Sequence, residues 1–102
     1  MEIINVGKEN FEKEVLNESK VLIDFNANWC GPCRMLRPIL DEVASENDNV
    51  KIVSINVDDE DELARTYGVM SIPCLVLIEN GQETKRSVGL ISKDEIKRLI
   101  GE

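Results

Sequence analysis

Hydrophobic residues in this chain follow two alternating patterns, short continuous runs and longer stretches with a helical period. Continuous runs rich in Val, Ile and Leu occupy residues 3–6, 21–25 and 51–57. Residues 9–16 and 33–46 instead repeat apolar positions every three or four residues, as one face of an amphipathic helix does. Because parallel strands need crossover connections, this alternation predicts parallel strands joined by helices in the first part of the chain.

The second part of the chain predicts a short helix and then a β-hairpin. Residues 60–67 carry acids in their first turn, where the helix dipole favours them, and a glycine follows. Strand-like runs at residues 75–78 and 85–88 flank the pair Asn80-Gly81, which is a strong signal for a hairpin turn. These two strands are therefore expected to be antiparallel.

A last helix completes the pattern. The segment Ser92-Lys93-Asp94-Glu95 matches a capping box, and apolar residues follow it at helical spacing. The full order is βαβαβαββα, so we expect an α/β fold with a central mixed sheet and helices on both faces. At 102 residues and 42% hydrophobic composition the chain has room for one domain, assigned to residues 1–102.

The charge of the chain argues against several classes of partner. A net charge of -8 disfavours sequence-independent binding to nucleic acid or anionic lipid, since both need clustered Lys and Arg. The N-terminus carries acid rather than the basic stretch of a signal peptide, and no apolar run is long enough to span a membrane. We expect a cytoplasmic protein that binds neither nucleic acid nor membranes.

The counts of His and Cys narrow the chemistry further. The chain has no His, which removes Cys-His and Ser-His-Asp catalysis and the commonest zinc ligand. Three cysteines are odd in number and too few for a secreted scaffold held together by disulfides. Any chemistry is therefore expected to use thiols and carboxylates.

Two of the cysteines form a closely spaced dithiol, Trp29-Cys30-Gly31-Pro32-Cys33, between an apolar run and a helical pattern. Thiols three positions apart at the start of a helix lie on one face, within reach of a disulfide bond. Zinc binding is the competing interpretation, but a tetrahedral site needs four ligands and only Cys74 and carboxylates remain. The spacing therefore favours redox chemistry, with no metal.

The residues around the dithiol resemble the thioredoxin family over essentially the whole chain. The matching segments, in order, are Asp24-Phe25, Ala27, Trp29-Cys30-Gly31-Pro32-Cys33-Arg34, Pro38, Ile72-Pro73, Asn80-Gly81 and Val88-Gly89. A Cys-x-x-Cys motif alone would be a weak indication, whereas this ordered set is specific. The resemblance implies the thioredoxin fold and reduction of protein disulfides, with a thioredoxin reductase as electron donor and no bound cofactor.

Helix placement suggests different roles for the two thiols. A disulfide is attacked by a thiolate, and Cys30 lies where unpaired N–H groups and the positive end of the helix dipole favour the anion. Cys33, one turn further on, is the candidate resolving thiol. Pro32 suits an early helix position because it needs no N–H partner, and Gly31 leaves room for a substrate chain.

Asp24 is an acid within an otherwise apolar strand, where desolvation should raise its pKa. The resemblance implies that it serves Cys33 as a proton shuttle, because a carboxylate with a raised pKa is a better proton acceptor near neutral pH. The simpler alternative is a strand-end carboxylate bonded to solvent or to the backbone.

The resemblance also implies a surface that docks substrates. Ile72-Pro73 matches the family position where a cis peptide bond faces the dithiol, leaving the Ile72 backbone free to pair with an extended substrate. The apolar and small residues expected on this surface are Trp29, Gly31, Pro32, Met70, Ile72, Pro73, Val88 and Gly89. Taken singly, Met70 and Val88 are as easily explained by packing. Arg34, Arg37 and Met70 suggest a docking edge for the electron donor.

Three residues depart from the family pattern near the expected site. Asn26, Ser54 and Cys74 stand where members commonly have Trp, Lys and Thr. Asn26 could hydrogen-bond the dithiol loop or Asp24, and loss of the Lys should leave Asp24 more strongly neutralised. Cys74 could simply fill the Thr position as a small buried residue, or it could act as a regulatory thiol beside Cys30.

Two classes of function follow. The leading expectation is an enzyme, a monomeric thiol-disulfide oxidoreductase that acts on disulfide-containing proteins through Cys30 and Cys33. The alternative is a redox-sensitive binding module or a subunit of a larger assembly.

Overall fold

The computed structural model describes all 102 residues. The elements, in chain order, are β1 (Ile4–Asn5), η1 (Glu12–Leu16), β2 (Lys20–Asn26), α1 (Gly31–Glu46), β3 (Lys51–Asn56), α2 (Asp61–Thr66), β4 (Cys74–Glu79), β5 (Gln82–Val88) and α3 (Lys93–Leu99). This order agrees with the pattern read from the sequence. None of the helices combines the length and the apolar character needed to span a bilayer.

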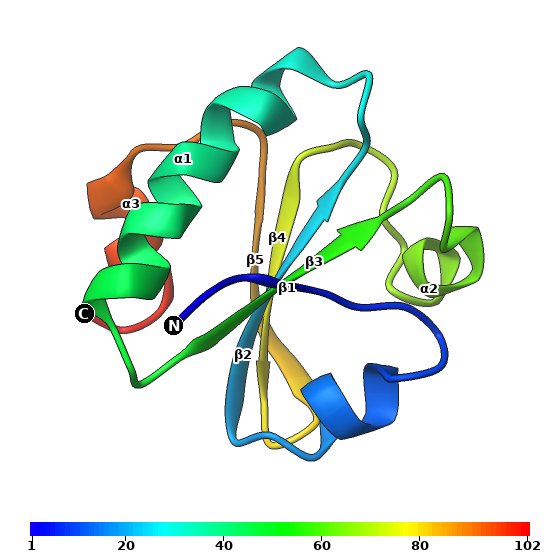
Figure 1. Cartoon of the computed structure of the whole chain (residues 1–102), viewed down its shortest axis with the longest axis horizontal. Coiled ribbons are helices and arrows are strands. Elements are labelled where there is room, and N and C mark those ends of the chain that lie inside the picture. Colours follow the sequence, from blue (N-terminus) through cyan, green and yellow to red (C-terminus); the bar gives the residue numbers. More distant parts are fainter.

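The five strands form one mixed sheet in the order β1-β3-β2-β4-β5. The strands β1, β3 and β2 are parallel, whereas β4 runs antiparallel to both β2 and β5. The turn between β4 and β5 uses Asn80 and Gly81 at φ 52° and 82°, the left-handed backbone that favours Asn and Gly. In Figure 1, α1 and α3 cover one face of the sheet while α2 and the blue helical turn η1 lie on the other side.

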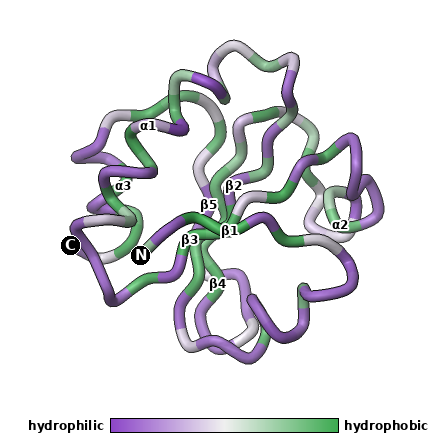
Figure 2. The backbone as a smooth tube through the Cα atoms, in the orientation of Figure 1, coloured by the Kyte–Doolittle hydropathy of each residue, from purple (hydrophilic) through white to green (hydrophobic).

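Side-chain alternation along the strands separates the interior into two apolar layers. The layer under η1 and α2 is formed by buried residues that include Val15, Ile23, Phe25, Val76 and Ile78. The layer under α1 and α3 has as members Leu22, Leu36, Leu40, Val43, Ile52, Leu75, Leu77 and Ile96. Hydrophobic segments accordingly gather along the central strands in Figure 2, and hydrophilic segments lie in the outer loops.

The positions that face α1 change from apolar to polar toward the carboxyl ends of two central strands. Leu22 on β2 and Ile52 on β3 pack under the helices, but the next residues of the same parity are Asp24 and Ser54, which are paired in register. Both polar side chains are buried. The alternation therefore places a buried acid on the face covered by α1, at the edge where that helix begins.

The first helix differs from the amphipathic α-helix expected over residues 9–16. Its ordered part is a short π-helix in which the N–H of Asn17 donates to the carbonyl of Glu12, five residues back, at 3.0 Å. Within it Val15 is fully buried, whereas Leu16 is 38% exposed. The wider turn leaves Leu16 outside the apolar layer.

Candidate active site

The dithiol lies at the start of α1. Cys30 is the N-cap residue, and its Sγ accepts a hydrogen bond from the N–H of Cys33 at 3.2 Å. The two residues form a disulfide, with their Cα atoms 5.2 Å apart. Pro32 occupies the first turn, where its missing N–H leaves no hydrogen bond unmade. Both cysteines are almost fully buried in the oxidised state.

The helix start also sets the electrostatics of Cys30. The first turn of an α-helix has N–H groups without intrahelical partners, and its dipole is positive at that end. Opening the disulfide leaves the Cys30 sulfur at this end of α1, in reach of the Cys33 N–H. Both effects favour the thiolate over the thiol.

Asp24 lies beneath the dithiol on the α1 face of β2. Its side chain is 1% exposed, and its Oδ1 has no hydrogen-bond partner. Burial raises its pKa from 3.8 to about 6, a rise that the positive charge of Arg37 and the amide of Asn26 partly offset. Asp24 and Cys33 line one cavity of about 340 Å³, whose wall also includes Asn26, Asn28, Arg34 and Arg37. A carboxyl with this pKa can exchange protons near neutral pH.

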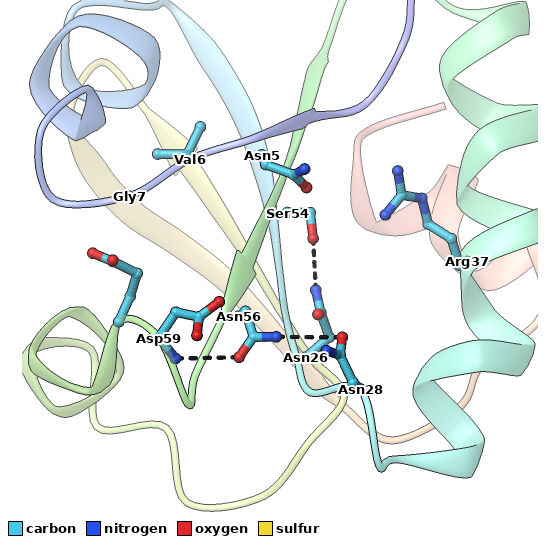
Figure 3. Close-up of a pocket in the computed structure, with 10 residues that line it drawn as sticks. Asn5, Val6, Gly7, Asn26, Asn28, Arg37, Ser54, Asn56 and Asp59 are labelled. Carbon is cyan, nitrogen blue, oxygen red and sulfur yellow. Dashed lines mark hydrogen bonds between the residues drawn. The ribbon is translucent and has the colours of Figure 1, made fainter.

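A polar crevice of about 430 Å³ adjoins this cavity. Across its floor the Asn26 amide donates to the Ser54 hydroxyl at 2.8 Å, and the Asn56 amide donates to Oδ1 of Asn28 at 3.4 Å. Figure 3 shows these pairs at the ends of β2 and β3, with Arg37 projecting toward them from α1. The crevice and the Asp24 cavity share Asn26, Asn28 and Arg37, so polar groups continue from the buried acid to the surface.

The peptide bond between Ile72 and Pro73 is cis, as expected. The Ile72 carbonyl oxygen lies 3.9 Å from Cys30 Sγ, and neither the N–H nor the C=O of Ile72 has a backbone hydrogen-bond partner. Pro73 is tied to Gly89, whose N–H donates to the Pro73 carbonyl at 2.8 Å. An unpaired backbone segment therefore lies directly beside the dithiol.

Comparison with known proteins accounts for this arrangement. A family model described as Thioredoxin matches residues 2–102. The chain belongs to the thioredoxin family. It is 45% identical over 95 residues to the thioredoxin of Chlamydia trachomatis, covering 93% of this chain and 92% of that protein. It is 43% identical over 101 residues to the thioredoxin of Bacillus subtilis, covering 98% and 96% of the two chains.

The solved structures agree with the sequence relatives. A mutant thioredoxin from Halobacterium salinarum superposes with a TM-score of 0.88 at 37% identity, covering 96% of this chain and 86% of that one. The expected thioredoxin fold is therefore confirmed. Family membership, together with a Cys30–Cys33 disulfide at the family's active-site position, makes this chain a thiol-disulfide oxidoreductase of the thioredoxin type.

Half of the residues expected on the docking surface are exposed, namely Trp29, Pro32, Met70 and Val88. Gly31, Ile72 and Gly89 are partly buried, and Pro73 is buried. Trp29, Met70 and Val88 are 69%, 96% and 57% exposed. Gly31 has no atom within 4 Å of the place where a Cβ would lie, so its side of the thioredoxin motif is open. The exposure of Met70 and Val88 disagrees with the packing explanation for these two side chains.

Cys74 lies on the opposite face of the sheet from Asp24. It is 1% exposed and belongs to the apolar layer under η1 and α2, in register with Phe25 and Val88 on the neighbouring strands. Burial is the main cause that raises the pKa of its thiol. A buried, protonated thiol is a weak nucleophile, so these surroundings favour packing.

Two contacts of the site were missed by sequence reasoning. The indole N–H of Trp29 donates to Oδ2 of Asp58 at 2.8 Å, and the sequence pattern had given Asp58 no role. Arg37 was assigned to a docking edge, yet it lines the Asp24 cavity. Its position four residues after Cys33, one helical turn away, was the signal for that placement.

Proposed function

We propose that Cys30 is the attacking thiol and Cys33 the resolving thiol of a protein disulfide reductase. The Cys30 thiolate attacks one sulfur of a substrate disulfide, forming a mixed disulfide and releasing the other substrate sulfur as a thiolate. Cys33 then loses its proton and attacks Cys30 Sγ, which releases the second substrate sulfur and forms the Cys30–Cys33 disulfide. The observation that carries this assignment is the position of Cys30 as the N-cap of α1, with Cys33 one turn further inside the helix.

Asp24 is the proposed proton acceptor for Cys33. The two residues line one cavity, and a buried carboxylate without a partner on Oδ1 has a free lone pair for that proton. Its pKa of about 6 leaves it ionised at neutral pH yet more basic than an ordinary aspartate. The polar crevice offers a path by which the proton can leave to solvent.

Substrates are proposed to dock as an added strand beside Ile72. The unpaired N–H and C=O of Ile72 supply the two main-chain hydrogen bonds, and main-chain pairing lets one enzyme accept many sequences. The exposed side chains of Trp29, Met70 and Val88 and the open glycine positions give an apolar rim around the pair. The expected docking set is Trp29, Gly31, Pro32, Ile72, Pro73 and Gly89.

The cycle requires an external electron source. Reducing the Cys30–Cys33 disulfide consumes two electrons and two protons, and no bound cofactor is needed because a thioredoxin reductase can deliver them by dithiol exchange.

Residues 1–102 are proposed to act as one domain and as a monomer, in the cytoplasm, where thiols are kept reduced. Light scattering coupled to size exclusion tests the monomer directly.

An insulin reduction assay with dithiothreitol separates this enzyme from the alternative of a redox-sensitive binding module. The wild-type chain should accelerate precipitation of the insulin B chain, and Cys30→Ser should remove the acceleration. Lys85→Ala, an exposed change away from the dithiol, serves as the control. A wild-type chain that does not exceed the dithiothreitol background would favour the binding module.

A further inference from the structure

The edge strand β5 contains a bulge that re-phases its side chains. Leu77 pairs with Lys85 and the next residue, Ile78, pairs with Glu83, so Thr84 is an extra residue on β5. In a regular strand, residues three apart point to opposite faces. The extra residue places Glu83 and Arg86 on the same face, because their register partners Ile78 and Val76 both belong to the layer under η1 and α2.

This shared face allows a bidentate ion pair. Arg86 Nε donates to Glu83 Oε2 and Nη2 donates to Oε1, both at 2.8 Å. Two parallel bonds fix the plane of a guanidinium as well as its position. The pair is about one-third exposed on each side chain. The carboxylate therefore fixes the direction of the remaining guanidinium N–H groups.

The remaining guanidinium N–H groups of Arg86 contact the start of the segment from Tyr67 to Pro73, whose far end lies beside the dithiol. Arg86 Nη2 also donates to the carbonyl of Tyr67, and Nη1 donates to the carbonyl of Gly68 at 3.5 Å. Tyr67 is the C-cap of α2, where carbonyls lack intrahelical partners. A single side chain of β5 thus joins the end of α2 to the edge of the sheet.

The segment after this contact carries the proposed docking groups. Residues 70–72 form no backbone–backbone hydrogen bonds, and the segment is tied at its ends by Val69 N–H to Ala64 carbonyl at 2.9 Å and by Gly89 N–H to Pro73 carbonyl at 2.8 Å. Met70 is 96% exposed and Ile72 faces Cys30. Because residues 70–72 have no backbone–backbone hydrogen bonds of their own, the positions of Met70 and Ile72 depend on the contacts that fix the end of α2.

We propose that the Glu83–Arg86 pair is a positioning device for protein substrates, holding the segment from Tyr67 to Pro73 so that Met70 and the Ile72 backbone meet the incoming chain. The proposal rests on the docking role given to these residues under the proposed function. It makes Arg86 a determinant of affinity for extended polypeptide disulfides. A small disulfide that reacts with Cys30 without spanning Met70 and Ile72 should not depend on Arg86.

The test compares Arg86→Lys and Arg86→Ala with Lys85→Ala, which removes the same charge from the neighbouring position of β5 and has no hydrogen bond to lose. With insulin as substrate, Arg86→Ala should raise KM by about 3- to 10-fold, the value of one or two net hydrogen bonds, with kcat within about twofold. Arg86→Lys should lie between, because an ammonium cannot hold the bidentate contact and both carbonyls together. Lys85→Ala should match the wild type.

A second substrate and a second measurement distinguish a loss of substrate positioning from a general disruption of the fold. The rate with hydroxyethyl disulfide should be unchanged in every variant, and amide hydrogen exchange in residues 69–72 should be faster in both Arg86 variants. Equal losses with insulin and the small disulfide, or an unchanged insulin KM, would overturn the positioning role. Met70→Ala measured in parallel separates the two proposals. If it raises the insulin KM while the Arg86 variants do not, the docking role of Met70 is supported and the positioning role of the Glu83–Arg86 pair is contradicted. If Met70→Ala also has no effect, the docking assignment itself fails.

Discussion

Asp24 has the surroundings in which a carboxylate is least stable. It is buried on the α1 face, its Oδ1 has no partner, and burial raises its pKa to about 6. The sequence predicted this residue because an acid interrupts an apolar strand. A hydrogen bond from Asn26 to Asp24 was one of the two options given by the sequence, whereas the positive charge of Arg37 beside this carboxyl was not predicted, because that contact depends on how α1 lies across β2.

Replacing Asp24 by Asn should stabilise the oxidised protein in a pH-dependent way. The folded state binds the proton more tightly than the unfolded state, with pKa values of about 6 and 3.8, so ionisation destabilises the fold as pH rises between them. The gain in free energy of unfolding should therefore reach about 2–3 kcal/mol above pH 6 and disappear below about pH 4. Urea unfolding across this range, with the exposed Asp48→Asn as control, measures it.

The same substitution should slow turnover because Cys33 loses its proton acceptor. Single-turnover mixing of the reduced variant with insulin should show mixed-disulfide formation at the wild-type rate and slower release of reduced insulin. A variant with unchanged release would contradict the shuttle role and leave Asp24 as a buried polar residue only.

Cys74 illustrates where a residue identity alone leaves two roles open. Its burial between neighbouring strands favours packing over regulation. Cys74→Val should therefore leave the redox potential and the loss of activity in hydrogen peroxide unchanged, with free energy of unfolding within about 1.5 kcal/mol of the wild type. A variant that resists peroxide better than the wild type would instead support the regulatory thiol.

At the scale of elements, the sequence predicted best the features that depend only on nearby residues. The Asn80-Gly81 turn and the capping box at Ser92 both formed as predicted, since each depends on local backbone chemistry. The last strand was predicted at residues 85–88, but β5 begins at Gln82. Its first half was missed because those residues are polar and show no apolar alternation. The bulge at Thr84 had no signal, since it is set by pairing with β4.

The position of Cys30 at the start of α1 predicts unequal thiol reactivity in the reduced protein. The helix terminus should favour the thiolate of Cys30 over that of Cys33, because only the N-cap sulfur receives an N–H bond from the first turn. Iodoacetamide labelling followed by peptide mass spectrometry should modify Cys30 first at every pH from 6 to 8, and Cys74 last. Equal labelling of Cys30 and Cys33 would contradict this assignment.

At the scale of the whole molecule, the site is assembled from segments far apart in sequence. Three segments meet at one edge of the sheet: the carboxyl end of β2, the start of α1 and the Ile72-Pro73 segment. The N–H of Gly89 ties this last segment to the end of β5 by donating to the Pro73 carbonyl. The resemblance to the thioredoxin family predicted which segments meet. The polar crevice of Asn26, Asn28, Ser54 and Asn56 was not predicted, because it depends on the register between β2 and β3.

Trapping of the mixed disulfide tests the division of roles between the two thiols most directly. Reduced Cys33→Ser, which lacks the resolving thiol, is mixed with a protein disulfide and analysed by non-reducing electrophoresis and mass spectrometry. A stable adduct linked through Cys30 is the predicted result, with little or none from Cys30→Ser. An adduct that forms through Cys33 in Cys30→Ser, with none in Cys33→Ser, would contradict the account.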